Sequence, residues 1–430
     1  MQTAASRARR TGSSWAPAAL LFLLPLSVLG FAQVSLGLLA GLIGLYPVLL
    51  GAGLKHQSFR VITGLTLAVL ATAPALMWHA TLTPGRTIAG RQAFHRIADL
   101  LTAVLIIATI LWASRQMSQR SIIAYFAAGL LTQQLLDHSV WKNDPWKYAL
   151  AFPVAMLLLS IVWKRRRLEV LALLATGLVS VQYDYRGFAG FAAISVILLY
   201  FYRRPRTAKS SPIRRIVIVV AVTIAAYEVG VWAALNGDLG SGIQQTSITQ
   251  TSGGRSLIDA ARPEWRAAVA LFANNPLGFG PGVVPSANDV LSAEAHLNPN
   301  ATNSQYVKDY LFGNGIELHS TLSDGWSYYG LFGFSLILYL TFLILRWFAA
   351  SIARGNLTSV EVFLPVSVLW DAFFSPMSAL PRIALGAGLA IAAAAPSCVR
   401  SMAVTNGPSS TGLMRQCPGS RAGAPISRGA

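Results

Sequence analysis

Long apolar runs follow one another through most of this chain, and they limit its possible folds more than any other feature. Each run approaches the length of about 20 helical residues that crosses a hydrocarbon layer about 30 Å thick. Counting them gives about twelve candidate crossings, centred on Ala18–Phe31, Leu36–Leu54, Val61–Met77, Ala98–Ala113, Ile122–Leu136, Tyr148–Trp163, Val170–Val181, Phe188–Tyr202, Ile216–Leu235, Tyr329–Phe348, Val360–Leu380 and Ile383–Pro396. A helix satisfies its own backbone groups in lipid, whereas an open strand does not. The predicted fold class is therefore all-α, a polytopic membrane protein.

Composition supports this fold class and restricts the partners. Hydrophobic residues make up 54% of the chain and charged residues only 12%, with a mean hydropathy of +0.53, whereas soluble domains contain about 25% charged residues. In a soluble chain the net charge of +18 would suggest nucleic acid. In a membrane protein the cytoplasmic loops collect Lys and Arg, so we expect membrane lipids and no nucleic acid as partners.

One long segment, residues 236–325, is not strongly apolar and lies between the predicted helices 9 and 10. It holds half of the 16 acidic residues and is net negative. The loops predicted on the inner side are rich in Lys and Arg. The loops predicted on the outer side hold fewer, except for the one around Arg86, Arg91 and Arg96. The charge asymmetry predicts that the segment lies outside and that both termini lie in the cytoplasm.

These observations divide the chain into four regions. We predict helices 1–9 in residues 1–235, the large outer loop in residues 236–325 and helices 10–12 in residues 326–400. Residues 401–430 are rich in Gly, Ser, Pro and Arg without periodicity, which is typical of a disordered cytoplasmic tail.

Inside the large loop, residues 263–273 predict a short helix. A proline suits its first turn, and Trp265, Val269 and Phe272 fall on one face. We expect this helix to lie on the membrane surface with that face down, which would place Arg266 near the depth of the lipid headgroups.

A glycine-rich turn follows this helix. Gly278, Gly280 and Gly282 come close together, with Pro281 between the last two. Glycines let backbone N–H groups approach an anion, although no Gly-Lys-Ser/Thr follows as in a P-loop. An ordinary turn is the alternative, because glycine spacing alone specifies little.

Three arginines of the loop, Arg255, Arg262 and Arg266, are candidates for binding phosphate. A guanidinium stays charged and holds phosphate through two parallel hydrogen bonds. A diphosphate at the membrane surface would suit them. The alternative is internal pairing with Asp259 and Glu264.

Charged residues also occur at or inside predicted crossings, where they are costly unless paired or solvated. Arg186 stands at an outer junction with Asp184 as its local partner, and its functional alternative is a further phosphate contact that faces the loop. Glu228 and Asp371 are carboxylates inside predicted crossings, and Asp371 stands near Arg382. Each acid is a candidate for a catalytic or a pairing role.

His319 is the candidate for proton transfer. Neutral imidazole can take a proton from a hydroxyl near pH 7, although a loop histidine is commonly just solvated. Its fixed spacing to Gly330 and Gly333 distinguishes it, and we expect these glycines to let helix 10 pack closely against a neighbour.

Together these motifs resemble a known group of proteins. Gly254-Arg255, Trp265-Arg266, the run Asn275-Pro-Leu-Gly-Phe-Gly280 and the element His319-Ser320-x9-Gly330-x-x-Gly333 are similar to the O-antigen ligase and polysaccharide polymerase superfamily. Its members are bacterial inner-membrane glycosyltransferases with about twelve helices and a large periplasmic loop between helices 9 and 10. The histidine element resembles that of the ligases in particular.

The resemblance implies a substrate and roles for single residues. The donor would be a glycan on undecaprenyl diphosphate, Arg186, Arg255 and Arg266 would hold the diphosphate, and Arg262 would be a weaker addition. His319 would activate the acceptor hydroxyl, with no metal, nucleotide or other cofactor. Residues 324–326, Asp-Gly-Trp, depart from the expected pattern.

The acceptor therefore stays open. It would be lipid A-core or another glycan in a ligase of lipopolysaccharide synthesis, and the next lipid-linked repeat unit in a polymerase, including polymerases of exopolysaccharide, with a chain-length regulator as a possible partner. A flippase or transporter of lipid-linked glycan is the alternative from another class. Transporters place working charges at mid-membrane on broken helices, whereas the polar residues here gather in one loop. A non-catalytic assembly scaffold is a third hypothesis.

Overall fold

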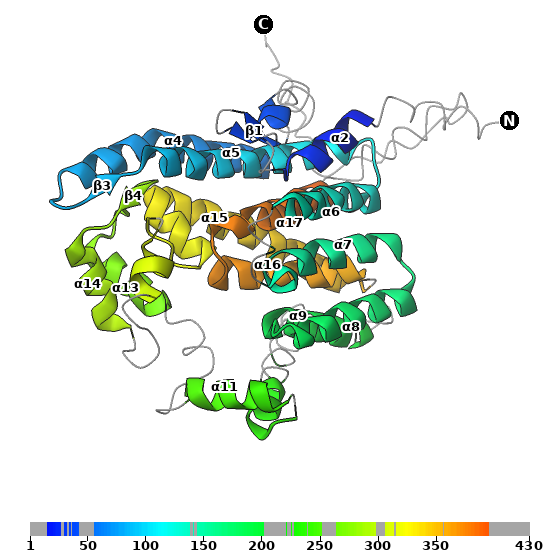
Figure 1. Ribbon diagram of the computed structural model, residues 1–430. Helices are drawn as coiled ribbons and strands as arrows, with labels where there is room; N and C mark the ends of the chain where they lie inside the picture. Colours follow the sequence, from blue (N-terminus) through cyan, green and yellow to red (C-terminus); the bar gives the residue numbers. More distant parts are fainter. Residues whose placement is uncertain are drawn as a thin grey trace, which may run out of the picture. The chain divides into compact units, whose positions relative to one another are not determined.

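The fold is seen in a computed structural model of the chain (Figure 1). It describes residues 15–26, 30–31, 34–35, 37–42, 56–137, 141, 144–201, 221, 225, 228–238, 240–251, 264–297, 306–313, 315–355 and 357–394. The elements, in chain order, are α2 (Trp15–Leu23), β1 (Gly30–Phe31), β2 (Val34–Ser35), α4 (Gln57–Thr81), β3 (Thr87–Ile88), α5 (Gly90–Ala113), α6 (Gln119–Leu136), η3 (Trp146–Leu150), α7 (Ala151–Ile161), α8 (Arg166–Gln182), α9 (Arg186–Phe201), α11 (Ser241–Thr251), α13 (Glu264–Asn274), β4 (Val283–Val284), α14 (Ala287–His296), η4 (Tyr306–Leu311), α15 (Thr321–Arg354), α16 (Ser359–Phe374), η5 (Met377–Ala379) and α17 (Leu380–Ala394).

The predicted helical class is confirmed. Helices account for most of the described residues, and each of the strands β1 to β4 is two residues long. Among the described residues, four helical segments are long and apolar enough to cross a membrane, namely α4, α5, α15 and the stretch Met377–Ala394 formed by η5 and α17. The candidate crossings between Val61 and Tyr202 fall on helices α4 to α9, several of which are shorter than a full crossing.

Two candidate crossings are interrupted. α2 ends at Leu23 and β1 follows at Gly30, so Ala18–Phe31 is not one helix. α16 ends at Phe374, and Pro376 stands before the short helix η5. Because the residue before a proline is disfavoured in helical conformation, the run Val360–Leu380 divides into two elements.

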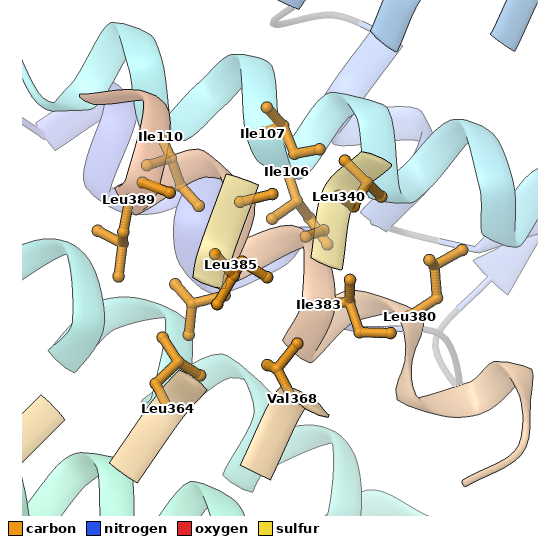
Figure 2. Close-up of a cluster of buried hydrophobic side chains, with 14 of the residues drawn as sticks. Ile106, Ile107, Ile110, Leu340, Leu364, Val368, Leu380, Ile383, Leu385 and Leu389 are labelled. Atoms are coloured by element: carbon orange, nitrogen blue, oxygen red, sulfur yellow. The ribbon is translucent and has the colours of Figure 1, made fainter. Parts of the chain in front are cut away.

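α17 lies in the middle of the main hydrophobic core. Figure 2 shows side chains of this helix meeting side chains from α5, α15 and α16. The labelled members of this cluster are Ile106, Ile107, Ile110, Leu340, Leu364, Val368, Leu380, Ile383, Leu385 and Leu389. These side chains are aliphatic and closely packed, so they hold the four helices together. They carry no group that could take part in a reaction.

α15 bends sharply at Gly330. This glycine has φ 63° and ψ −152°, which is outside the helical region. Residues eight positions apart in a continuous helix are about 12 Å apart, yet a Cβ on Gly325 would lie 3.4 Å from the carbonyl oxygen of Gly333 and 3.0 Å from Ile337. At Gly333 the expected close packing is therefore packing of α15 against itself. At Gly330 it is packing against neighbours, because an added Cβ would lie 2.5 Å from the carbonyl oxygen of Leu277 and 3.4 Å from Leu76 of α4. The nine residues between Ser320 and Gly330 form a short helical arm that folds back on the longer segment.

Part of the predicted outer loop packs against the hairpin between α4 and α5. β4 pairs with β3 of the hairpin in an antiparallel ladder (Figure 1), and the N–H of Ala89 donates to the carbonyl of Gly282 at 2.8 Å. A second small core joins Ala80 of α4 to Leu271 of α13 and Phe279 of the turn. These contacts hold this part of the loop against the α4–α5 hairpin.

Candidate functional site

His319 has a backbone conformation that is unusual for its residue type. Its φ is 51°, in the left-handed region that costs a non-glycine residue about 1–2 kcal/mol. The neighbouring residue Leu318 is held in place because its N–H donates to Oδ1 of Asp324 at 2.7 Å. Asp324 is 1% exposed, and its Oδ2 accepts from the N–H of Met377 at 2.9 Å. The Asp324 carboxylate thus fixes the backbone beside the candidate base.

On its other side, His319 is anchored to the end of α16. The Thr321 hydroxyl donates to the carbonyl of Asp371 at 3.0 Å or to that of Ser375 at 2.9 Å. The Ser320 hydroxyl donates to the carbonyl of Ala372 at 3.3 Å. The last carbonyls of a helix have no partners within it, so this residue pair caps α16 while it places the histidine.

The His319 ring has a defined protonation pattern when it is neutral. Nδ1 lies 3.1 Å from the carbonyl oxygen of Glu317, and a carbonyl can only accept. The proton is therefore on Nδ1, and Nε2 carries the lone pair that a general base requires. The ring of Tyr310 stacks on the imidazole at 3.9 Å between centroids, with 15° between the planes.

Arg96 of α5 holds the segment before His319. Its guanidinium forms an ion pair with Glu317, the residue whose carbonyl orients the imidazole. The same guanidinium lies 4.9 Å from the ring centre of Tyr328, and the carbonyl of Arg96 accepts from the hydroxyl of Tyr329 at 2.5 Å. Arg96 therefore connects α5, the segment before His319 and the short arm of α15.

Arg186 begins α9 and forms both of its alternative contacts. Nε donates to Oδ1 of Asp184 at 2.9 Å, which is the expected structural pair. Nη1 donates to the hydroxyl of Ser247 at 3.0 Å, and this serine belongs to α11, inside the predicted loop. The arginine therefore faces the loop as expected and is also paired locally.

The helix α13 is confirmed, and one member of its predicted apolar face differs from the expectation. Val269 and Phe272 are exposed, whereas Ala267 and Leu271 are buried. Trp265 does not share their exposed face, because its Nε1 donates to the carbonyl of Phe373 at 2.9 Å. The start of α13 is thus attached to the end of α16, with Arg266 exposed beside it.

Asp371 is almost fully buried and pairs with Arg382. Its Oδ2 lies 3.1 Å from Nε of Arg382, and its Oδ1 accepts from the Ser375 hydroxyl at 2.8 Å. The Arg382 guanidinium also lies 5.2 Å from the ring centre of Phe152. This geometry assigns Asp371 a structural partner.

The elements meet at the last residues of α16 and the Ser375 that follows the helix, and we call Trp370–Ser375 the α16 terminus. It receives Ser320 and Thr321 beside His319, Trp265 beside Arg266, and Arg382. Trp370 lies 5.5 Å from Phe191 of α9 between ring centres, and a Cβ on Gly187 would touch Trp370 at 3.6 Å. Elements that carry three predicted site residues, Arg186, Arg266 and His319, therefore converge here.

The glycine turn is a structural turn, and its backbone donors are used within the protein. The N–H groups of Phe279 and Gly280 both donate to the carbonyl of Ser327, at 2.8 and 3.0 Å, and that of Gly278 donates to Asn275. Gly278, Gly280 and Gly282 all have positive φ. The anion-binding interpretation of this turn is not supported, because three of its N–H groups already have acceptors.

Other predicted site residues are placed less fully. Arg255 and Arg262 lie outside the described residues. Glu228 is exposed on a helical stretch. Within the part of the chain that the structure describes, there is no group of three or more His, Cys, Asp or Glu side chains that could hold a metal ion.

Sequence reasoning missed Arg96, Glu317 and Tyr310 as neighbours of His319. One signal was available. The arginines around Arg96 were the exception to the charge asymmetry on the outer side, and the loop was rich in acids, so mutual pairing could have been inferred.

In comparisons with family models and with curated proteins, no match to this chain is found.

Proposed function

We propose that this chain is an integral membrane glycosyltransferase that transfers a glycan from undecaprenyl diphosphate to an acceptor hydroxyl. The observation that carries the proposal is His319, whose neutral ring has its proton on Nδ1 and its lone pair on Nε2, and which is anchored where the elements bearing Arg186 and Arg266 meet. A base and fixed cations on neighbouring elements are what transfer from a lipid diphosphate requires.

The proposed reaction uses these groups in sequence. Nε2 of His319 takes the proton of the acceptor hydroxyl as its oxygen bonds to the anomeric carbon of the donor. The bond from that carbon to the diphosphate oxygen breaks, and undecaprenyl diphosphate leaves. Arg186 and Arg266, with Arg255 and Arg262 from the resemblance, would stabilise the charge on the leaving group, so the step needs no metal or nucleotide.

The proposed topology follows the sequence. The chain crosses a bacterial inner membrane about twelve times, with both termini in the cytoplasm and residues 236–325 at the periplasmic face. The apolar helices and the charge asymmetry support this arrangement. The anchoring of part of that loop on the α4–α5 hairpin supports a fixed site at one end of the helices.

One assay separates the two reactions that share this chemistry. Purified protein is given lipid-diphosphate-linked glycan with and without lipid A-core. Product ladders without added acceptor indicate a polymerase, and a single transfer that requires lipid A-core indicates a ligase. If no glycan is transferred under either condition, but lipid-linked glycan moves across the bilayer of vesicles that contain the protein, the protein is a flippase. If the protein is inactive in both assays, the scaffold hypothesis is favoured.

A further inference from the structure

The exposed side of α13 forms an apolar surface that the proposed chemistry does not use. Val269 is 63% exposed, Phe272 46% and Leu277, in the turn that follows, 56%. We call these three residues the α13 face. The opposite side of the helix is buried in the small core through Ala267 and Leu271. The helix therefore has one apolar side packed against protein and a second apolar side that is exposed.

The α13 face lies beside the bend of α15. A Cβ on Gly330 would lie 2.5 Å from the carbonyl oxygen of Leu277. The ring of Phe272 lies 5.3 Å from the ring of Trp326 in the short arm of α15, between centroids, and Trp326 Nε1 donates to the carbonyl of Pro276 at 2.9 Å. The face therefore adjoins the point where the long segment of α15 begins.

The long segment of α15 continues the apolar surface. Most of its exposed large apolar residues recur at intervals of three and four, which is one face of a helix. They are Leu331, Phe334, Leu338, Phe342 and Leu345, and Phe332 is exposed beside them. This helix is long and apolar enough to cross a membrane, and a crossing helix turns such a stripe toward lipid. This stripe and the α13 face meet at the bend, because Leu277 contacts Gly330 and Leu331 begins the stripe.

We propose that the α13 face is immersed in the outer leaflet of the membrane that α15 crosses, with acyl chains as its partner. Continuity with the stripe decides for lipid, because a partner protein on the α13 face alone would leave the adjoining stripe unexplained. Arg266 precedes Val269 by one turn and is also exposed. A long charged side chain at this depth extends its head to the polar interface.

Nitroxide accessibility tests this proposal directly. Full-length protein with Cys398→Ser and Cys417→Ser is given one cysteine at a time, as Val269→Cys, Phe272→Cys or Leu277→Cys. Each is spin-labelled and placed in vesicles of phosphatidylethanolamine and phosphatidylglycerol. Leu338→Cys on the stripe is the lipid reference, and Asn288→Cys, exposed on α14, is the water reference. Oxygen concentrates in the bilayer, whereas a nickel chelate stays in water.

The proposal predicts an oxygen-to-nickel accessibility ratio at the three sites that is several-fold above that of Asn288→Cys and close to that of Leu338→Cys. A ratio equal to that of Asn288→Cys would overturn it by placing the face in water. Low accessibility to both reagents would also overturn it, because another protein surface would then cover the face. The readout does not involve glycan transfer, so it stands or falls separately from the proposed enzyme activity.

Discussion

Arg86 and Asp289 form a buried two-point ion pair between residues 203 positions apart in the chain. Nε donates to Oδ2 at 2.8 Å and Nη2 to Oδ1 at 2.7 Å, and the two side chains are only 8% and 9% exposed. The guanidinium also lies 4.6 Å from the ring centre of Phe279 in the glycine turn. This pair joins the α4–α5 hairpin to α14 and so attaches the loop to the helices.

We predict that Asp289→Asn destabilises the protein by about 3 kcal/mol or more, because it leaves a buried guanidinium without its charge partner. Unfolding of purified protein in mixed micelles measures the loss. Glu294→Gln changes a charge on the same helix and should leave the free energy of unfolding nearly unchanged. Equal stability of Asp289→Asn and wild type would show that the pair does not hold the loop.

The same pair predicts how stability depends on pH. Burial of Asp289 opposes its ionisation, but hydrogen bonds from Arg86 and Ser286 outweigh this and hold its pKa below the ordinary value of 3.8. The carboxylate therefore contributes stability above pH 3.8 that is lost as the pH falls through the lower folded-state pKa. Melting temperatures of wild type and Asp289→Asn should converge below pH 3.8, and a constant difference would refute this.

The glycine turn should not tolerate side chains. Gly282 has φ 72°, and a Cβ there would lie 2.5 Å from the backbone nitrogen of Ala93. Backbone cannot move aside as a flexible side chain can, so Gly282→Ala should lower the free energy of unfolding by about 2 kcal/mol or more. Gly90→Ala is the matched control, since an added Cβ there meets nothing within 4 Å. Equal melting temperatures of the two variants would show that the Gly282 backbone is not closely packed against Ala93.

Much of the helical content could be predicted from the sequence because apolar runs and helix ends are local signals. α4, α5, α13 and the turn after α13 fall where their residue patterns place them. The attachment of the loop could not, because the pairing of Arg96 with Glu317 spans 221 positions. The opposite net charges of the hairpin and the loop indicate attraction, but they do not show which arginine pairs with which acid.

The site was predictable in part for the same reason. His319 stands out by its spacing to Gly330, but the reason for that spacing, an arm folded back at the bend, depends on tertiary packing. In the α16 terminus, the sequence singles out only Asp371. The anchoring of Thr321 and Trp265 there had no sequence signal, because backbone carbonyls rather than side chains receive them.

Arg96 should act as a positioning residue for His319. Arg96→Gln releases Glu317, whose carbonyl orients the imidazole. We therefore expect kcat for transfer to fall about tenfold, which corresponds to an activation free energy about 1.4 kcal/mol higher. KM should change little. The pH profile of kcat should shift as His319 loses its fixed partner. Arg91→Gln, an exposed arginine on the same helix, is the control.

A double-mutant cycle shows whether Arg96 works through Glu317. Contacting residues have interaction energies of about 0.5–3 kcal/mol, whereas independent sites add. Arg96→Gln combined with Glu317→Gln should therefore be no slower than either single variant. Additive losses would mean that Arg96 contributes to transfer by another route.

The most direct test compares two histidines in a transfer assay with lipid-diphosphate-linked glycan, without metal or nucleotide. His319→Ala removes the proposed base and should lower the transfer rate by at least about 100-fold, the usual contribution of a general base. His296→Ala changes an exposed histidine of α14 and should leave the rate unchanged. Loss with His319→Ala alone is the predicted result, and wild-type rates in both variants would contradict the proposed role of His319.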